Sequence, residues 1–206
     1  MPENTSITFS SVFLDKTPPI DVRIDEMIRW GKQISEYGFI PGAEGNLSFR
    51  TIMGFIISGS GIPLDNMPKD MPVEVRGVVF GLNRPSIYAK GQVVPSKETL
   101  LHSGIYEVMT EINAIICVPN RGILETAMKN GLPSTGIEQS AGSQELMQEA
   151  VSLVKLNRNV RCFVLKNYCV VALGTTMSDA GKQIEALQAS AKNSAPSKIG
   201  KKKVLK

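Results

Sequence analysis

The order of two hydrophobic patterns constrains this fold more than any other feature of the chain. Between residues 46 and 89, the β-rich runs LSFR, GFIIS, VEVRGVVF and SIYA are separated by turn-forming segments, which is typical of strands joined mainly as antiparallel hairpins. After residue 95, helical periodicity alternates with short buried strands. Strands flanked by helices predict an α/β fold, a three-layer α/β/α sandwich around a central, largely antiparallel sheet.

The first helix is expected over residues 20–37, where Asp21 can act as a cap and Gly38 follows the last apolar residue. Ser96 can cap a second helix that runs to about residue 110. The same criteria predict helices at 121–130, 143–156 and 178–193, and strands at 114–118, 162–165 and 169–173.

The length of 206 residues and the hydrophobic content of 42% favour one domain. We expect an N-terminal arm at residues 1–19, a single domain at 20–193 and a basic, disordered tail at 194–206. Six lysines and no acidic residue lie between Lys192 and Lys206, so the net charge of +4 becomes −2 without them. A basic tail on an acidic domain argues against a nucleic-acid interface on the folded part.

Three cysteines, Cys117, Cys162 and Cys169, form an odd set without CxxC spacing. Buried free thiols in a reducing compartment are the simplest interpretation, and we therefore expect a cytoplasmic protein. No apolar stretch reaches the ~20 residues of a transmembrane helix, because Gly, Pro or a charged residue interrupts each one.

Three segments have the composition of an anion site. PGAEGN ends in Gly45 and Asn46 before a strand, SGSG contains Ser60 and Gly61 after a strand, and PSKE begins a helix. Glycine turns and the first amides of a helix can bind phosphate or carboxylate groups. Each segment alone also fits an ordinary turn or helix cap.

His102 is the only histidine of the chain, which excludes a metal site of two or three histidines within one subunit. Glu98 lies four residues earlier on the same helix. The pair presents either a base beside an imidazole or a simple hydrogen bond between neighbouring turns.

Four motifs in order, EGNLSFR, ISGSGIPLDNM, PSKETLLHSGIYEVMTEINAIICV and KNYCVVALGTTMSDAGKQIEALQASAK, resemble the class II aldolase/adducin family. This family includes fuculose-phosphate and rhamnulose-phosphate aldolases and ribulose-phosphate 4-epimerases. The resemblance covers about residues 24–191 and implies an α/β/α sandwich. It also implies a zinc cofactor and a cyclic tetramer with active sites at subunit contacts.

The resemblance assigns roles to individual residues of this sequence. Phosphate would be bound by a set of five residues: Gly45, Asn46, Ser60, Gly61 and Ser96. Lys97 stands beside them, where the family commonly has a small hydroxyl residue. Glu98 matches the acid/base glutamate of the family.

The same resemblance places the zinc ligands at Cys117, Pro119 and Tyr168, where the family has histidines. Proline has no donor atom, and a phenol is a poor zinc ligand at neutral pH because its pKa is near ~10. We therefore expect no zinc cofactor and no efficient zinc-dependent catalysis.

The leading hypothesis is a catalytically inactive family member that binds a small phosphorylated or carboxylated ligand. One alternative is a divergent sugar-phosphate aldolase or epimerase with a metal site rebuilt from Glu98, His102, Cys117 or Cys169. Another is a metal-free acid/base centre formed by Glu98 and Tyr168. A third is an adducin-like protein-interaction module, in which the pocket has no role.

Overall fold

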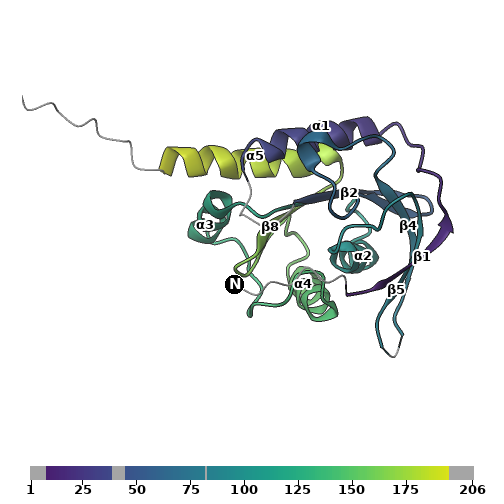
Figure 1. The fold of residues 1–206 in the computed structure, drawn as a ribbon. Coiled ribbons are helices and arrows are strands. Elements are labelled where there is room, and N and C mark those ends of the chain that lie inside the picture. Colours follow the sequence, from purple (N-terminus) through teal and green to yellow (C-terminus); the bar gives the residue numbers. More distant parts are fainter. Residues whose placement is uncertain (1–7, 39–44, 82, 195–206) are drawn as a thin grey trace, which may run out of the picture.

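The computed structural model describes residues 8–38, 45–81 and 83–194. These residues form one eight-stranded sheet in the order β1-β5-β4-β3-β2-β6-β8-β7 (Figure 1). Every neighbouring pair is antiparallel except β1 and β5, which are parallel. The strands are β1 (Ser10–Asp15), β2 (Asn46–Thr51), β3 (Gly54–Ile57), β4 (Val73–Val79), β5 (Ser86–Lys90), β6 (Ala114–Val118), β7 (Cys162–Leu165) and β8 (Cys169–Gly174).

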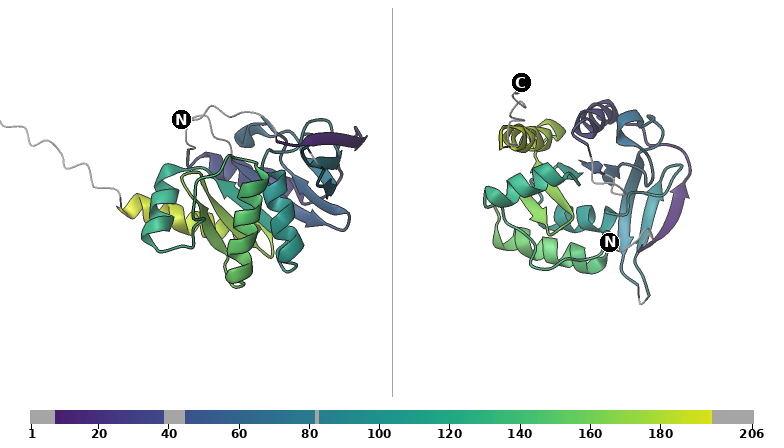
Figure 2. Two further views of the ribbon diagram at one scale, coloured as in Figure 1. Left: turned by 90° about the horizontal axis from the view of Figure 1, so that it is seen from below. Right: turned by 60° about the vertical axis from the view of Figure 1, so that its left-hand side comes forward.

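Helices cover both faces of the sheet (Figures 1 and 2). On one face lie α1 (Ile24–Ser35), α3 (Arg121–Lys129) and α5 (Met177–Ser194), and on the other lie α2 (Thr99–Val108) and α4 (Gln144–Leu156). A short 3-10 helix, η1 (Leu64–Asn66), packs beside α1. The predicted three-layer sandwich around a largely antiparallel sheet is confirmed.

Strand β6 shows how the sequence builds the two layers of core. All five of its residues are buried, as expected of a strand that is covered on both faces. Ile115 and Cys117 face the core beneath α2 and α4, whereas Ile116 and its neighbours Ala114 and Val118 face the core beneath α1, α3 and α5.

Two helices begin later than the sequence predicted. Helix α1 begins at Ile24 rather than at residue 20, and the side chains of Ile20 and Val22 are 97% and 90% exposed. The Asp21 carboxylate accepts the backbone N–H of Arg23 at 2.9 Å, in the turn that precedes α1. Helix α2 begins at Thr99. A hydrogen-bonded turn therefore precedes the N-terminus of each of these two helices.

The N-terminal arm contributes a strand that the sequence did not predict. Ser10–Asp15 forms β1 and pairs with β5 at the edge of the sheet. The predicted tail, apart from Ser194 at the end of α5, lies outside the described residues, as do residues 41–44 of the first glycine-rich turn. Within the described ranges, no helix has the length and apolar character needed to span a membrane.

Candidate functional site

The start of α2 is joined to the turn that follows β3. The backbone N–H of Ser96 donates to the carbonyl of Ser58 at 3.0 Å, and that of Ser60 donates to Val94 at 2.8 Å. The Ser58 hydroxyl in turn accepts the N–H of Leu47 at 3.3 Å. These hydrogen bonds bring together three segments that the sequence predicted to bind an anion: the start of β2, the SGSG turn and PSKE.

Asn46 is the least satisfied polar residue of this region. Its side chain is 3% exposed, and its Oδ1 atom has no hydrogen-bond partner within residues 8–38, 45–81 and 83–194. Gly45 beside it is buried, and Gly61 adopts a φ of 72°, a conformation that favours glycine. A buried amide oxygen without a donor is costly, and it marks a place where a ligand can supply the missing partner.

The hydroxyl of Ser96 does not cap α2 in the predicted way. It accepts a long hydrogen bond of 3.4 Å from the backbone N–H of Glu98, and Glu98 itself occupies the N-cap position without a side-chain cap. The Ser96 carbonyl accepts from the backbone and the hydroxyl of Thr99. Ser96 therefore shapes the turn before α2, and its side chain is 6% exposed.

Glu98 is fully buried and held by two donors. The phenol of Tyr168 donates to its Oε1 at 2.7 Å, and the backbone N–H of Gly142 donates to its Oε2 at 3.3 Å. Burial raises the pKa of Glu98, an effect that these hydrogen bonds and the charge of Lys97 only partly oppose. Burial and the nearby Glu98 likewise raise the pKa of Tyr168 well above its ordinary value.

A chain of buried side chains runs through the middle of α2. The hydroxyl of Ser48 lies 2.7 Å from both Tyr106 Oη and His102 Nδ1, and His102 Nε2 lies 3.3 Å from Cys117 Sγ. Burial lowers the pKa of His102 to about 3, so the imidazole is neutral at pH 7. A neutral imidazole has one donor and one acceptor, which matches its two partners.

Glu98 and His102 do not form the side-chain pair that the sequence allowed. Only their backbones meet, through a helical hydrogen bond of 3.1 Å. The two side chains have separate partners and belong to separate clusters.

The residues at the family's metal positions do not fit zinc. Cys117 faces His102, Pro119 has no donor atom, and the Tyr168 hydroxyl is bonded to Glu98. In the part of the chain that the structure describes, no three His, Cys, Asp or Glu side chains are arranged to hold a metal ion. Among these described residues, Glu98, His102, Cys117 and Cys169, the set predicted for a rebuilt site, are not grouped as metal ligands.

All three cysteines are free thiols. Cys117 and Cys169 are buried, and Cys162 is half-buried. Burial raises the pKa of Cys162 to about 12, and burial together with the Cys117 thiol raises that of Cys169. The raised pKa values of Cys162 and Cys169 indicate that these two thiols are unreactive and structural.

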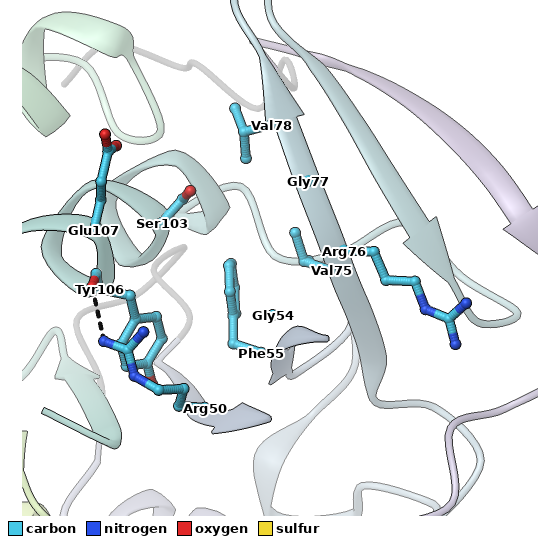
Figure 3. A pocket seen from close by; sticks show the side chains of 10 residues that line it. All are labelled: Arg50, Gly54, Phe55, Val75, Arg76, Gly77, Val78, Ser103, Tyr106 and Glu107. Carbon is cyan, nitrogen blue, oxygen red and sulfur yellow. Dashed lines mark hydrogen bonds between the residues drawn. The ribbon is translucent and has the colours of Figure 1, made fainter. Parts of the chain in front are cut away.

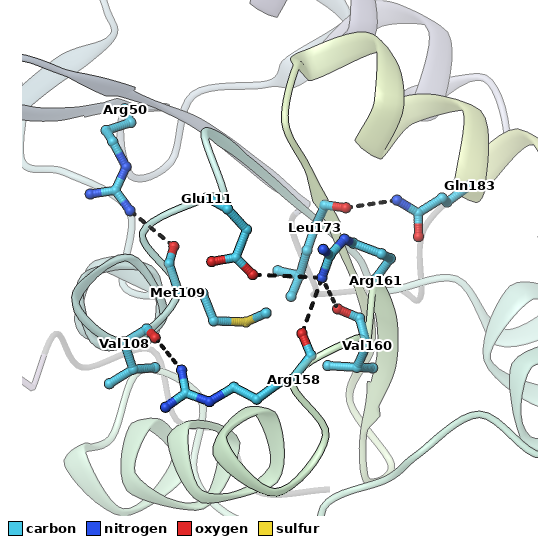
Figure 4. A network of polar contacts seen from close by, with 9 residues as sticks. All are labelled: Arg50, Val108, Met109, Glu111, Arg158, Val160, Arg161, Leu173 and Gln183. Atoms are coloured by element: carbon cyan, nitrogen blue, oxygen red, sulfur yellow. Dashed lines mark hydrogen bonds and ion pairs between the residues drawn. The ribbon is translucent and has the colours of Figure 1, made fainter.

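Sequence reasoning missed a pocket of about 250 Å³ between α2 and strand β4 (Figure 3). The guanidinium of Arg50 lies over the Tyr106 ring in this pocket, 4.7 Å from its centroid. Arg50 also donates to the carbonyl of Tyr106, in the last turn of α2, and to those of Met109 and Ile112, which follow the helix. Figure 4 shows the surrounding network, in which Arg158 donates to the Val108 carbonyl at 2.7 Å. These arginines complement the negative end of the helix dipole.

Two residues of the site itself were also missed, Ser48 and Gly142. Ser48 and Leu47 are neighbours on β2, so their side chains point to opposite faces of the sheet, and both are buried. A small polar residue in an otherwise apolar, buried strand could have indicated that Ser48 has a polar partner. Gly142 lies in a loop between α3 and α4, and its role depends on tertiary contact with Glu98. Nothing in the local sequence indicates that contact.

Comparison with known families assigns the chain to a class. The profile of the Class II Aldolase and Adducin N-terminal domain matches residues 25–194. The chain therefore belongs to the class II aldolase and adducin N-terminal domain family.

Solved structures of aldolases have the same fold. An L-fuculose 1-phosphate aldolase is 22% identical, with a TM-score of 0.67 over 85% of this chain and 86% of that one. The L-fuculose-1-phosphate aldolase of Thermus thermophilus is 18% identical, with a TM-score of 0.66 over 84% and 93%. A sugar-phosphate aldolase from Thermotoga maritima is 16% identical, with a TM-score of 0.64 over 82% and 92%. At these identities the similarity establishes the fold alone.

Proposed function

We propose that this protein binds a small phosphorylated or carboxylated ligand at the start of α2 and does not catalyse zinc-dependent aldol cleavage or epimerisation. One observation carries the proposal: the Tyr168 phenol donates a hydrogen bond of 2.7 Å to Oε1 of the buried Glu98. Tyr168 occupies a position where the family has a metal-binding histidine. The acid/base residue thus has an internal partner in place of a metal centre.

The ligand site consists of Gly45, Asn46, Ser60, Gly61, Ser96 and Lys97. Support comes from the hydrogen bonds that join their segments and from the buried side-chain amide of Asn46. Its Nδ2 can donate to an anion, and its Oδ1, which has no partner among the described residues, can accept a ligand hydroxyl. The positive end of the α2 dipole and the lysine charge both favour an anion.

A divalent ion in the family's enzymes polarises the substrate's oxygens and stabilises the enediolate that forms on carbon–carbon cleavage. Loss of that assistance raises the barrier by several kcal/mol, and each ~1.4 kcal/mol is tenfold in rate. Glu98 can hold or release a proton but cannot replace the missing positive charge. Its role is vestigial in this proposal.

Two further properties belong to the proposal. A homo-oligomer, a tetramer by family resemblance, is supported by exposed apolar side chains, among them Ile20, Ile52 and Leu156, which are 97%, 102% and 85% exposed. A cytoplasmic location is supported by the free state of all three cysteines.

Thermal unfolding with inorganic phosphate and a panel of sugar phosphates tests the binding. A ligand at 100 times its Kd stabilises the fold by about 2.7 kcal/mol, which corresponds to a rise in Tm of roughly 5–10 °C. Asn46→Asp places a negative charge in the site and is expected to abolish the rise. Asn193→Asp, the same change at an exposed position of α5, is the control and keeps it.

The two parts of the proposal fail in different ways. Stoichiometric zinc in the purified protein, together with retro-aldol cleavage of any sugar phosphate, overturns the absence of zinc chemistry. A Tm that no ligand of the panel changes overturns the binding site and favours the adducin-like interaction module.

A further inference from the structure

The pocket between α2 and β4 is separate from the anion site proposed at the start of α2. Among the described residues, its lining includes none of those assigned to that site. Its volume of about 250 Å³ equals that of about eight water molecules, since each occupies about 30 Å³ in the liquid. A ligand of about eight to ten non-hydrogen atoms therefore fits the pocket.

Strand β4 forms an apolar wall of this pocket because its pairing with β5 is irregular there. The register shifts between Val75 and Gly77, and such a shift interrupts the alternation of side chains along a strand. Val75 and Val78 both pack against the core beneath α2, and Gly77 between them adds no side chain. The side chain of Arg76 is directed away from the pocket (Figure 3) and is bonded to Glu74 at 2.8 Å. The wall therefore carries no charge into the pocket.

Two aromatic rings line the inner part of the pocket. Phe55 and Tyr106 are buried, and their ring centroids lie 5.2 Å apart at an interplanar angle of 46°. The hydroxyl of Tyr106 is already paired with Ser48, so this residue offers a ligand its ring. Aromatic rings provide large apolar contact surfaces. The inner part of the pocket therefore suits an aromatic or branched apolar group.

Arg50 supplies a positive charge beside these rings. Its Nε and Nη2 atoms donate to backbone carbonyls, and its guanidinium lies 4.7 Å from the centroid of the Tyr106 ring. Within residues 8–38, 45–81 and 83–194, its Nη1 makes no hydrogen bond and no carboxylate pairs with it. Glu107 also lines the pocket, but it is exposed and its charge is screened by water. A half-buried guanidinium with free N–H groups favours a carboxylate.

We propose that this pocket binds a small monocarboxylic acid with an aromatic or branched apolar body. The apolar body packs on the rings of Phe55 and Tyr106 and against Val78, and the carboxylate accepts hydrogen bonds from Nη1 of Arg50. Apolar walls with a few polar groups are typical of small-molecule sites. The inference goes beyond the proposed function, because it concerns a different cavity and a different class of ligand.

Isothermal titration calorimetry of the full chain with phenylacetate and phenylacetamide tests this inference. The two probes have nearly the same size and shape, and only phenylacetate is charged. We expect the wild-type protein to bind phenylacetate at least about tenfold more tightly, the effect of a hydrogen bond between charged groups. Equal Kd values for the two probes, or binding of neither, overturn the inference.

Two variants that fill the pocket from opposite sides locate the binding. Ser103→Leu enlarges a half-buried side chain of α2, and Val78→Phe enlarges a half-buried side chain of β4. Each is expected to weaken phenylacetate binding at least about tenfold, because the added atoms occupy the ligand's volume, and to keep the circular dichroism spectrum of the fold. Ser152→Leu and Val79→Phe, the same changes at exposed positions, are the matched controls and keep the Kd within about threefold.

The variant Asn46→Asp separates this inference from the proposed function. Phenylacetate binding that is retained in Asn46→Asp and lost in both filled variants supports the pocket. Binding that is lost in Asn46→Asp and survives in Ser103→Leu and Val78→Phe places phenylacetate at the start of α2. That result overturns the pocket and leaves the proposed anion site intact.

Discussion

Polar groups around the start of α2 lack partners among the described residues, whereas those around its middle are paired. At the start, the Oδ1 of Asn46 has no donor and the ammonium of Lys97 has no carboxylate partner among the described residues. In the middle, Ser48 and His102 are paired at 2.7 Å, and their outer partners extend the chain in both directions. In the proposed function, the polar groups at the start of α2 are available to a ligand, whereas those in its middle are paired within the fold.

If the proposed function holds, the start of α2 contributes to binding and the middle of α2 contributes to stability. An unpaired buried polar group costs about 1–3 kcal/mol, and a protein retains that cost only where something else compensates it. The paired middle of α2 needs no such compensation. Mutations at the two places should therefore affect different measurements.

The largest expected effect is on the paired middle. Ser48→Ala leaves the His102 Nδ1 and the Tyr106 hydroxyl without partners in the core, and we expect it to lower the free energy of unfolding by about 3 kcal/mol. Chemical denaturation measures this change. Ser152→Ala removes an exposed hydroxyl from α4 and is expected to stay within about 0.5 kcal/mol. Equal effects of both variants would contradict the contrast.

The pH dependence of stability sharpens the same comparison. The pKa of His102 is about 3 in the folded protein and about 6.5 when unfolded, so its contribution is complete above pH 6.5 and is lost as pH falls toward 3. Between pH 7 and pH 5 the loss is about 2 kcal/mol. Glu98 acts in the opposite direction, because its pKa is raised and its contribution is lost as pH rises.

The variant His102→Gln isolates the histidine contribution from that of Glu98. Its deficit in unfolding free energy relative to the wild-type protein should shrink by about 2 kcal/mol from pH 7 to pH 5. Denaturation curves at the two pH values measure the deficit. A deficit that does not change with pH would mean that the imidazole is protonated, or solvent-exposed, in the folded protein.

The smallest expected effect on stability is at the open start of the helix. Asn46→Ala removes an amide oxygen that has no partner among the described residues. The cost of burying that oxygen, about 1–3 kcal/mol, offsets the packing that the smaller side chain loses, so we expect the free energy of unfolding to change by less than about 0.5 kcal/mol. In the proposed site, the Asn46 amide donates to the phosphate through Nδ2 and accepts a glycerol hydroxyl at Oδ1. Binding of glycerol 3-phosphate, followed by calorimetry, should therefore weaken at least about tenfold. A stability loss of about 2 kcal/mol or more would show that the Asn46 amide is paired within the fold.

Most of the fold was predictable because its periodicities are strong and local. The hydrophobic run at Ala114–Val118 matches β6, and Ser143 caps α4 by accepting the N–H of Leu146 at 3.1 Å. β1 was missed because a strand at the sheet edge buries little, and its segment carries no turn signal. Helices α1 and α2 begin later than predicted because a hydrogen-bonded turn precedes each of them. The residues of such a turn resemble those of a first helical turn.

The candidate site was only partly predictable for a different reason. The family resemblance and the residue types identified Glu98 and Tyr168 as candidates. Their hydrogen bond of 2.7 Å joins positions 70 residues apart, so it could not be predicted from local spacing. The spacing of Glu98 and His102 suggested a pair, and tertiary packing gave each residue another partner. Local spacing thus identifies candidates, whereas the choice of partners depends on which strands and loops meet α2.

The pairing of β1 has a consequence for the order of assembly. Ser10 pairs with Ser86, which comes much later in the chain, so β5 must form before β1 can dock. Closing so long a loop is entropically unfavourable, which makes this edge a late step in folding and an early one in local opening. Whenever β1 detaches, the backbone of β5 becomes a free template for another strand, so β1 covers an edge that would otherwise be open to edge-to-edge pairing.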